Sequence, residues 1–254
     1  MNKRTKDIFI VGFALFGSYF GAGNLIFPPL IGFLSGSQWS IAALGFCISA
    51  VLMPVVGLYV ISKNGGSLEA MTSDIHKNFA KFLLLFIMIF AACISVPRTG
   101  AVSYELGFKA LFPNVSIVAF IIGYFAIALY FSLDIDRMIN SVGKYLTPLL
   151  VILLIGIIIK GILTPIGVPV VPQQGGIFTH SLLEGYQTGD LIVSYLIGTV
   201  FIGDIVYRGY RTSKERNKLT AYCGVIALIL LAVIYAGLIH LGASVSSYYP
   251  KDID

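Results

Sequence analysis

Long apolar stretches are the feature that most constrains the fold of this chain. A bilayer core about 30 Å thick is crossed by an α-helix of roughly 20 apolar residues. Seven stretches meet this requirement: Ile8–Leu34, Ile41–Ser62, Phe82–Phe108, Val115–Leu133, Tyr145–Leu163, His180–Tyr207 and Leu219–Ala243. Transmembrane strands would be about 10 residues long with alternating polarity, which none of these runs shows. The sequence therefore predicts an all-α polytopic membrane protein with about seven transmembrane helices.

The composition excludes the main classes of water-soluble protein. Of the 254 residues, 57% are hydrophobic and 11% are charged, whereas an ordinary globular domain has about 25% charged residues. A disordered chain needs more polar residues, and a nucleic-acid-binding protein needs charges gathered on one exposed face. The three cysteines, Cys47, Cys93 and Cys223, each lie inside an apolar run. They are interpreted as packing residues and not as a disulfide framework or a zinc site.

The basic residues predict the orientation in the membrane. Most of the 17 Lys and Arg residues lie before the first run or in alternate connections between runs. These residues are Lys3, Arg4, Lys6, Lys63, Lys77, Lys81, Arg137, Lys144, Arg208, Arg211, Lys214, Arg216 and Lys218. Cytoplasmic loops carry such an excess, so the amino terminus is expected inside and the carboxy terminus outside. The net charge of +5 is then explained by contact with anionic inner-leaflet lipid, with no nucleic-acid partner.

The first apolar run contains residues that interrupt a helix. Phe20–Pro29 reads FGAGNLIFPP, in which the glycines permit unwinding and the double proline removes two backbone donors. A lipid-facing helix has no partner for the freed backbone groups, so a break is expected only where it lines a cavity. The alternative is that Gly17 and Gly21 form a GxxxG helix-packing motif.

The sixth run is polar at a depth where a span should be apolar. Glu184–Asp190 reads EGYQTGD, and Ser194–Thr199 follows as SYLIGT. Broken first and sixth spans are typical of an inverted five-helix repeat, whose two breaks face one another near the midplane. Residues 1–163 would form the first repeat, 164–180 a proline- and glycine-rich irregular outer loop, and 181–254 the start of the second repeat with an outer tail. Helix amino termini at the breaks can hold a carboxylate, and freed carbonyls and hydroxyls can hold a small cation.

Ionisable residues inside the membrane are functional candidates because buried charge is costly. Arg98 and Glu105 lie seven positions apart in the third run, and they could pair with Asp190 or Glu184 on another span. The alternative for Arg98 is a structural ion pair that fixes helix register. Glu184 could instead lie at the outer interface, and Asp204 at the inner one.

The sequence lacks the motifs of several common enzyme classes. There is no GxxxxGK[ST] loop, no HExxH and no GxSxG, so neither a P-loop ATPase nor the commonest hydrolases are indicated. His180 and His240 lie near the expected outer ends of spans, and neither is assigned a metal. We expect no enzyme activity and no cofactor, and energy for uphill transport would have to come from an ion gradient.

Three blocks together carry a resemblance to a known family: Phe20–Pro29, Pro97–Gly107 (PRTGAVSYELG) and Glu184–Gly198 (EGYQTGDLIVSYLIG). The chain resembles the bacterial branched-chain amino-acid carriers of the BrnQ type, the LIVCS family. The resemblance implies a leucine-transporter-like fold with five-plus-five inverted repeats. It also implies symport of leucine, isoleucine and valine across the bacterial cytoplasmic membrane, with Na⁺ or H⁺ as the coupling ion.

The resemblance also implies roles for particular residues. The substrate-binding residues would be Phe20, Gly21, Ala22, Gly23, Asn24, Tyr195, Gly198 and Thr199. By looser analogy with the wider superfamily, Asn24 and Ser194 would ligate the cation. Phe20 and Tyr195 could form apolar walls around the substrate side chain.

The number of spans departs from the family pattern. Members of this family usually have more than the seven spans counted here, so the chain is expected to be the front part of a carrier that does not transport alone. The missing carboxy-terminal half would then be a partner. Two alternatives are a non-transporting fragment or assembly partner, and an intramembrane enzyme that uses Glu105, Asp190 and Arg98 as acid, base and anion clamp.

Overall fold

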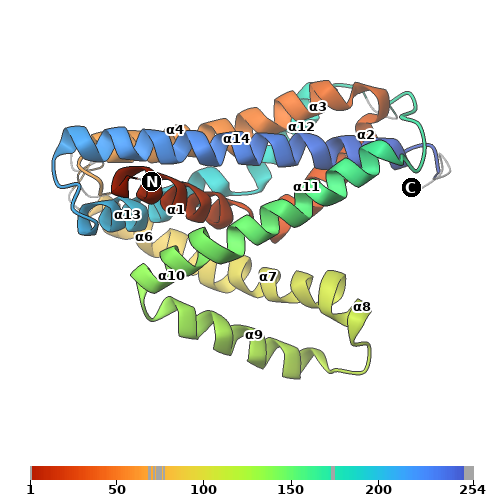
Figure 1. Cartoon of the computed structure of the whole chain (residues 1–254). Coiled ribbons are helices and arrows are strands. Elements are labelled where there is room, and N and C mark those ends of the chain that lie inside the picture. The colour runs from red at the N-terminus through yellow and green to blue at the C-terminus, as the bar shows by residue number, and fades with distance from the viewer. Residues whose placement is uncertain are drawn as a thin grey trace.

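The computed structural model describes residues 2–67, 70, 72, 76, 78–172 and 175–248, with nothing described of the side chain of Ala22. Regular secondary structure in these residues is entirely helical. Figure 1 shows a bundle built around the long helix α14, with α9 and the α6–α8 rod standing out from it as an arm.

The first half of the chain begins with a broken span. α1 (Lys3–Tyr19) and α2 (Ala22–Ser35) are separated at Phe20 and Gly21, and a 3₁₀ turn follows α2. The next rod comprises α3 (Trp39–Cys47), a π-helical segment (Ile48–Leu52) and α4 (Met53–Lys63).

The arm and the helices after it complete the predicted first repeat. The arm comprises α6 (Phe79–Phe90), a π-helical segment (Ala91–Ser95), α7 (Val96–Ser103), a second π-helical segment (Tyr104–Phe108), α8 (Lys109–Leu111) and α9 (Ile117–Ser132). The rod that leads back to the bundle comprises α10 (Ile135–Ser141), a π-helical segment (Val142–Leu146) and α11 (Thr147–Leu163).

The last three helices contain the second break. α12 (Ile177–Gln187) and α13 (Asp190–Tyr207) are separated at Thr188 and Gly189, and α14 (Ser213–Val245) runs uninterrupted for 33 residues. The sixth predicted run is therefore broken, as the sequence indicated.

Five helical stretches among the described residues are long and apolar enough to cross a membrane, compared with seven predicted runs. These stretches are Gly23–Lys63, Phe79–Leu111, Ile135–Leu163, Asp190–Tyr207 and Ser213–Val245. The difference has two causes. The break leaves α1 with 17 residues, and α9 is also short, with 16 residues. The all-α polytopic fold class is confirmed.

Prolines account for three of the π-helical segments. The segments end at Leu52, Ser95 and Leu146, and in each case a proline follows two residues later. A proline has no N–H and its ring crowds the carbonyl four residues earlier, so a locally wider turn relieves the clash. The segment that ends at Ser95 lies just before Pro97 and Arg98.

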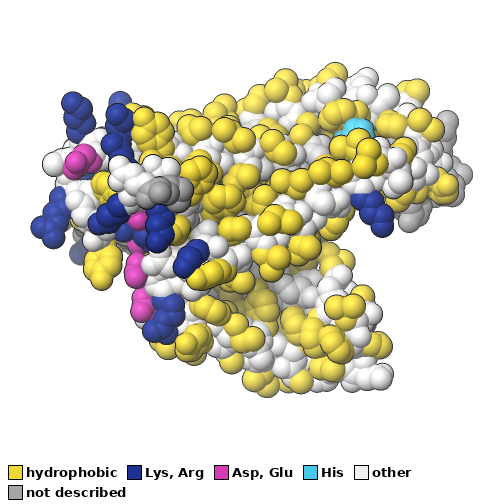
Figure 2. Space-filling model, in the orientation of Figure 1, with side chains coloured by type: hydrophobic (Ala, Val, Ile, Leu, Met, Phe, Trp, Pro, Cys, Tyr) yellow, Lys and Arg dark blue, Asp and Glu magenta, His cyan; other side chains and the backbone are white. Residues whose placement is uncertain are grey.

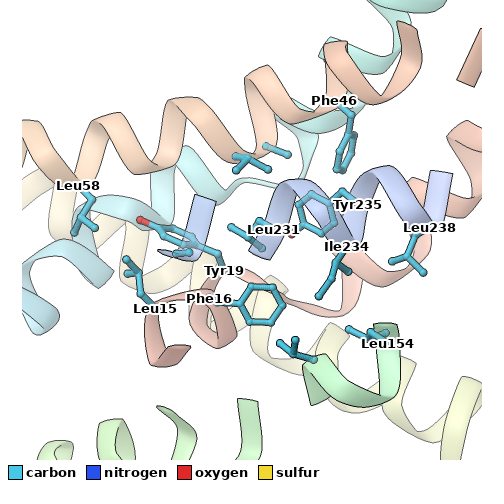
Figure 3. Close-up of a cluster of buried hydrophobic side chains, with 14 of the residues drawn as sticks. Leu15, Phe16, Tyr19, Phe46, Leu58, Leu154, Leu231, Ile234, Tyr235 and Leu238 are labelled. Carbon is cyan, nitrogen blue, oxygen red and sulfur yellow. The ribbon is translucent and has the colours of Figure 1, made fainter. Parts of the chain in front are cut away.

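The core is formed where α14 crosses α1, α2 and the α3–α4 rod. Gly32 of α2 lies directly against the carbonyl of Ile239, and Gly242 lies against the carbonyl of Pro29, so these two helices pack backbone to backbone. Small residues permit such close crossings inside membranes. Figure 3 shows the apolar cluster that results, with Tyr235 of α14 beside Phe46 and near Tyr19 at the end of α1.

The loop that follows α11 is held by contacts with the bundle. The amide N–H of Ser37 donates to the carbonyl of Val170 at 2.8 Å, and Ser246 accepts from the amide of Val170 at 3.1 Å. Residues 164–172 and 175–176 are irregular, as predicted for the stretch Thr164–His180, but its last four residues already belong to α12.

The basic side chains gather at one end of the bundle. Figure 2 shows Lys and Arg over the end where α1 begins and where α13 connects to α14. This arrangement agrees with the alternating pattern read from the sequence.

Candidate functional site

The two helix breaks face each other inside the bundle. α1 ends at Tyr19 and α2 begins after Gly21, while α13 begins after Gly189, whose φ of 77° favours glycine. The side-chain amide of Asn24, at the start of α2, donates to the Asp190 carboxylate at the start of α13 over 2.7 Å. One hydrogen bond therefore joins the first turns of the two resumed helices.

Asn24 is the centre of a small buried network. Its Nδ2 atom lies 2.6 Å from the Tyr19 carbonyl, 2.7 Å from Asp190 Oδ2 and 2.6 Å from the Tyr235 hydroxyl. Its side chain is almost fully buried. An amide NH₂ group has only two hydrogens, so three close oxygens compete for them. The network binds α1, α2, α13 and α14 to a single side chain.

A second set of bonds joins α1 to α13. The Tyr19 hydroxyl donates to Ser194 Oγ at 3.2 Å, and the Ser194 hydroxyl donates to the carbonyl of Asp190 at 2.7 Å. Ser194 has no exposed surface. Thr188 completes the surroundings of Asp190, because its hydroxyl lies 3.0 Å from Oδ2.

A cavity of about 180 Å³ lies between the breaks and has both polar and apolar walls. It is lined by Ser18, Tyr19, Gly21, Gly23, Asn24, Phe27, Ser95, Arg98, Thr99, Thr188, Asp190 and Val193. The amino termini of α2 and α13 both open toward this space and add positive potential there.

Two opposite charges line the cavity from different helices. Asp190 belongs to α13 and Arg98 to α7. The Arg98 guanidinium lies over the ring of Phe27, 5.6 Å from its centroid. Within the described part of the chain, neither charged group has an ion-pair partner within 4.0 Å.

A larger apolar cavity adjoins the first. Its volume is about 510 Å³, and it is lined by Phe20, Gly21, Leu25, Thr99, Val102, Ser103, Leu106, Gly107, Tyr124 and Leu150. Gly21 and Thr99 line both cavities. No atom lies within 4 Å of the position that a Cβ on Gly21 would take, so this glycine faces open space and is not a packing residue. Gly17, in contrast, packs against Thr147.

The residues predicted for substrate binding fall into two groups. Gly21, Gly23 and Asn24 line the smaller cavity, and Phe20 lines the apolar one. The side chain of Ala22 lies outside the described residues.

The second group lies away from the break. Tyr195 and Thr199 line separate cavities further along α13, and Gly198 is packed against Ile61 of α4. The helix is interrupted at Gly189 and is continuous through Gly198. Ser194, predicted as a cation ligand, has its hydroxyl engaged by Tyr19 and by the backbone.

The predicted intramembrane charges also separate. Glu105 pairs with Lys109 at 2.9 Å on an exposed face and lines neither cavity. Glu184 lies 3.8 Å from His180, one turn earlier in α12. Of the four predicted charges, Arg98 and Asp190 share a cavity, but the ion pair considered between them is not formed.

Sequence reasoning missed a second charged cluster, at the basic end of the bundle. Arg208 lies 2.6 Å from Asp204 and 3.3 Å from Asp7, and Asn140 accepts from it at 3.0 Å. Tyr210 donates to Asp7 at 2.9 Å. Asp204, for which the inner interface was one predicted position, pairs with Arg208 four residues later. Nothing in the sequence signalled the other partners of Arg208, because they come from α1 and α10.

Sequence reasoning also missed Tyr19, Thr188 and Tyr235 at the breaks. Tyr19 and Thr188 stand directly beside the FGAGN and GD motifs, so proximity to a break was a usable signal. Tyr235 lies inside an uninterrupted apolar helix and carries no such signal.

Comparison with known proteins gives the family. Residues 4–252 match the family described as branched-chain amino acid transport protein. The chain belongs to this family. It is 33% identical over 255 residues to the branched-chain amino acid permease BrnQ of Bacillus subtilis (strain 168), with 96% of this chain and 58% of the permease covered. It is 34% identical to BrnQ of Haemophilus influenzae over 94% of this chain and 57% of that permease.

A third relative shows a similar identity and coverage. BrnQ of Escherichia coli (strain K12) is 32% identical over 96% of this chain and 57% of its own length. The chain thus spans somewhat more than half the length of the curated relatives that it matches. These relatives are described as permeases. No solved structure matches it.

Proposed function

We propose that the protein takes part in ion-coupled symport of leucine, isoleucine and valine across the bacterial cytoplasmic membrane. The observation that carries the proposal is the bond between Asn24 and Asp190, which joins two opposed helix breaks at the wall of a cavity. Transporters with discontinuous helices bind substrate and coupling ion at such a place. Relatives described as branched-chain amino acid permeases support the substrate class.

The two cavities match the two chemical parts of these substrates. The smaller one has charged and polar walls that suit an α-amino and an α-carboxylate group. The adjoining one is lined mainly by apolar side chains that suit a branched aliphatic group. A pocket of this kind discriminates weakly among leucine, isoleucine and valine, because one methylene is worth about 1–3 kcal/mol.

The network around Asn24 supports coupling to Na⁺ or H⁺. The Tyr19 carbonyl, the Tyr235 hydroxyl and the Asp190 carboxylate place three oxygens around one amide nitrogen. Oxygens are the ligands that a hard cation takes, and a carboxylate can also carry a proton. We place the coupling ion beside Asn24. Ser194 acts there through its bonds to Tyr19 and Asp190 and not as a direct ligand.

We further propose how the chain is oriented in the membrane and how it divides into two inverted repeats. The basic end of the bundle lies in the cytoplasm, the amino terminus is inside, and the outer loop with the carboxy-terminal tail is outside. Residues 1–163 correspond to the first inverted repeat and residues 181–254 to the start of the second, with 164–180 as the connecting loop. In this arrangement α1 and α13 form the inner halves of the two broken spans.

Lipid and further helices cover the apolar outer faces. In the rod Phe79–Leu111, which forms part of the arm, only 11% of the most apolar stretch is buried inside the structure. In a carrier as long as the relatives, the carboxy-terminal half is the proposed partner for part of this surface.

Counterflow of labelled leucine in proteoliposomes tests the proposal. The chain is not expected to transport alone, so the vesicles contain it together with the carboxy-terminal half of a carrier as long as the relatives. Such vesicles, loaded with unlabelled leucine, should accumulate the label. Replacing external Na⁺ by choline, or collapsing the pH gradient, identifies the coupling ion. Failure to accumulate leucine, isoleucine or valine while another solute is carried would overturn the substrate assignment. Leucine binding without any counterflow would favour the alternative of a non-transporting assembly partner.

The alternative of an intramembrane enzyme has little support. It needs Glu105 near Arg98 and Asp190, but Glu105 lies on the exposed face of the arm in an ion pair with Lys109.

A further inference from the structure

Arg98 and Asp190 are opposite charges that line one small cavity without pairing with each other. Ionisable groups inside a membrane are stable only with a partner, and a buried charge left alone is costly. Asn24 and Thr188 both contact Oδ2 of Asp190. The other carboxylate oxygen, Oδ1, has no hydrogen-bond partner among the described residues. The gap between the two side chains suits a ligand that carries both charges.

Each end of the cavity has a definite polarity. Arg98 reaches the start of α2, where a nitrogen of its guanidinium lies 3.7 Å from the position of a Cβ on Gly23. The positive end of the α2 dipole adds to the guanidinium charge there. Asp190 supplies the negative end. A carboxylate is therefore favoured beside Arg98 and an ammonium group beside Asp190.

Phe27 and Gly23 keep the guanidinium in place. The Phe27 ring lies under Arg98, and a Cβ on Gly23 would come within 3.3 Å of that ring. A cation over an aromatic face is held electrostatically, more strongly where water is excluded. Phe27 is thus a positioning residue, and the absence of a side chain at Gly23 leaves room for it.

The adjoining apolar cavity fixes where the rest of the ligand goes. It meets the charged cavity at Gly21 and Thr99. A ligand with its charges between Arg98 and Asp190 can pass an aliphatic side chain over Gly21, where no Cβ stands in the way.

We propose that Arg98 binds the carboxylate and Asp190 the ammonium group of a zwitterionic amino acid, with the aliphatic side chain lying past Gly21 in the apolar cavity. This assignment rests on the proposed function and adds the polarity of the site. It also divides recognition between the arm and the bundle, since α7 carries one charge and α13 the other.

Binding of leucine analogues to the purified protein in nanodiscs tests the assignment. Leucinol lacks the carboxylate, and 4-methylpentanoate lacks the amine. Wild-type protein should bind leucine on the order of 10- to 100-fold more tightly than either analogue, the range expected for a hydrogen bond to a charged group. Arg98→Gln should reduce the leucine-to-leucinol ratio to about 1 and leave the leucine-to-4-methylpentanoate ratio within about twofold of wild type. Asp190→Asn should show the reverse pattern.

Matched variants separate recognition from folding. Arg98→Lys should restore part of the leucine-to-leucinol ratio, because it keeps the charge but loses the bidentate geometry. Lys109→Gln removes an exposed positive charge from the same rod and should change neither ratio. Helical circular dichroism of every variant should match wild type.

The outcomes distinguish a failure of the proposed function from a failure of the roles assigned to Arg98 and Asp190. No leucine binding by wild-type protein would contradict the proposed function itself. Leucine binding with unchanged analogue ratios in Arg98→Gln and Asp190→Asn would leave the function standing and overturn the polarity assigned here.

Discussion

Asn24 and Asp190 lie 166 positions apart in the chain, yet their side chains meet at 2.7 Å. Each residue stands in the first turn of a helix that resumes after a break. Their hydrogen bond is therefore a direct mechanical link between the two halves of the site, and changes at either residue should affect both breaks.

Asn24→Asp should abolish leucine binding and lower stability. The substitution places a second carboxylate next to Asp190 in a buried setting, where like charges disfavour each other. It also removes both amide hydrogens from three nearby acceptors, and an unsatisfied buried polar group costs about 1–3 kcal/mol. Tyr235→Phe removes only one of those acceptors and should have a smaller effect. Thermal unfolding in detergent together with leucine binding measures both. Wild-type affinity in Asn24→Asp would contradict the central place given to this side chain.

Gly189→Ala and Gly21→Ala should differ although both sites have open space around the missing Cβ. Gly189 has a φ of 77°, while Gly21 has a φ of −89° that any residue adopts. Alanine at Gly189 should cost about 1–2 kcal/mol because of the left-handed backbone. Alanine at Gly21 should leave stability within about 0.5 kcal/mol but weaken leucine binding, since it enters the junction of the two cavities.

Equilibrium unfolding of the two variants in mixed micelles gives the comparison. Equal destabilisation would show that the backbone conformation at Gly189 is not what the second break requires.

The ion pairs of Arg208 at the basic end of the bundle predict a latch, meaning a set of contacts that holds α1 against the end of α13. Cys223 lies buried on α14 with its thiol 3.6 Å from the carbonyl of Ile8, so it reports whether α1 has moved away. Asp7→Asn should increase the rate of Cys223 alkylation about tenfold, since loss of about 1.4 kcal/mol at the contact raises the open population by that factor.

The measurement uses a background in which Cys47 and Cys93 are replaced by serine. Glu105→Gln breaks an exposed ion pair on the arm and serves as the control. An alkylation rate that does not change in Asp7→Asn would mean that the cluster is not a latch for α1.

Tyr210 makes part of the latch dependent on pH. Partial burial and the hydrogen bond to Asp7 raise the pKa of Tyr210 to about 12. A raised pKa means that the protonated hydroxyl stabilises the fold fully below the ordinary tyrosine pKa of about 10, and that this stabilisation is lost as pH rises through about 12. A difference absorbance titration of wild type against Tyr210→Phe should show one tyrosine that ionises near pH 12. Ionisation of that tyrosine near pH 10 would contradict the contact with Asp7.

Close packing of α2 against α14 should tolerate no side chain. Gly32→Val and Gly242→Val place a side chain against the facing backbone, so we expect each to prevent folding or to cost more than about 3 kcal/mol. Gly156 on α11 has no atom within 4 Å of its missing Cβ, and Gly156→Ala should be neutral or stabilising by up to about 1 kcal/mol. Yield of monodisperse protein after detergent extraction compares the three variants. Normal yield of Gly32→Val would contradict the backbone contact.

The sequence by itself determined the fold class, the two broken spans and the family. Apolar runs and their charges report directly on the membrane, and glycine and proline act on the backbone at their own positions, so these features are local. The breaks were found within a few residues for this reason. The resemblance to a family implied substrate-binding roles for Tyr195, Gly198 and Thr199. These residues belong to an uninterrupted helix beyond the break, and Gly198 packs against α4.

Only the tertiary structure decided which charges share a cavity. Arg98 and Glu105 looked equivalent in the sequence, but the arm turns one toward the breaks and the other outward to Lys109. Tyr235 joined the Asn24 network, and Asp7 joined Arg208, through contacts between helices far apart in the chain. Which side chains meet depends on how helices cross and rotate against one another. No local pattern of residues encodes that geometry.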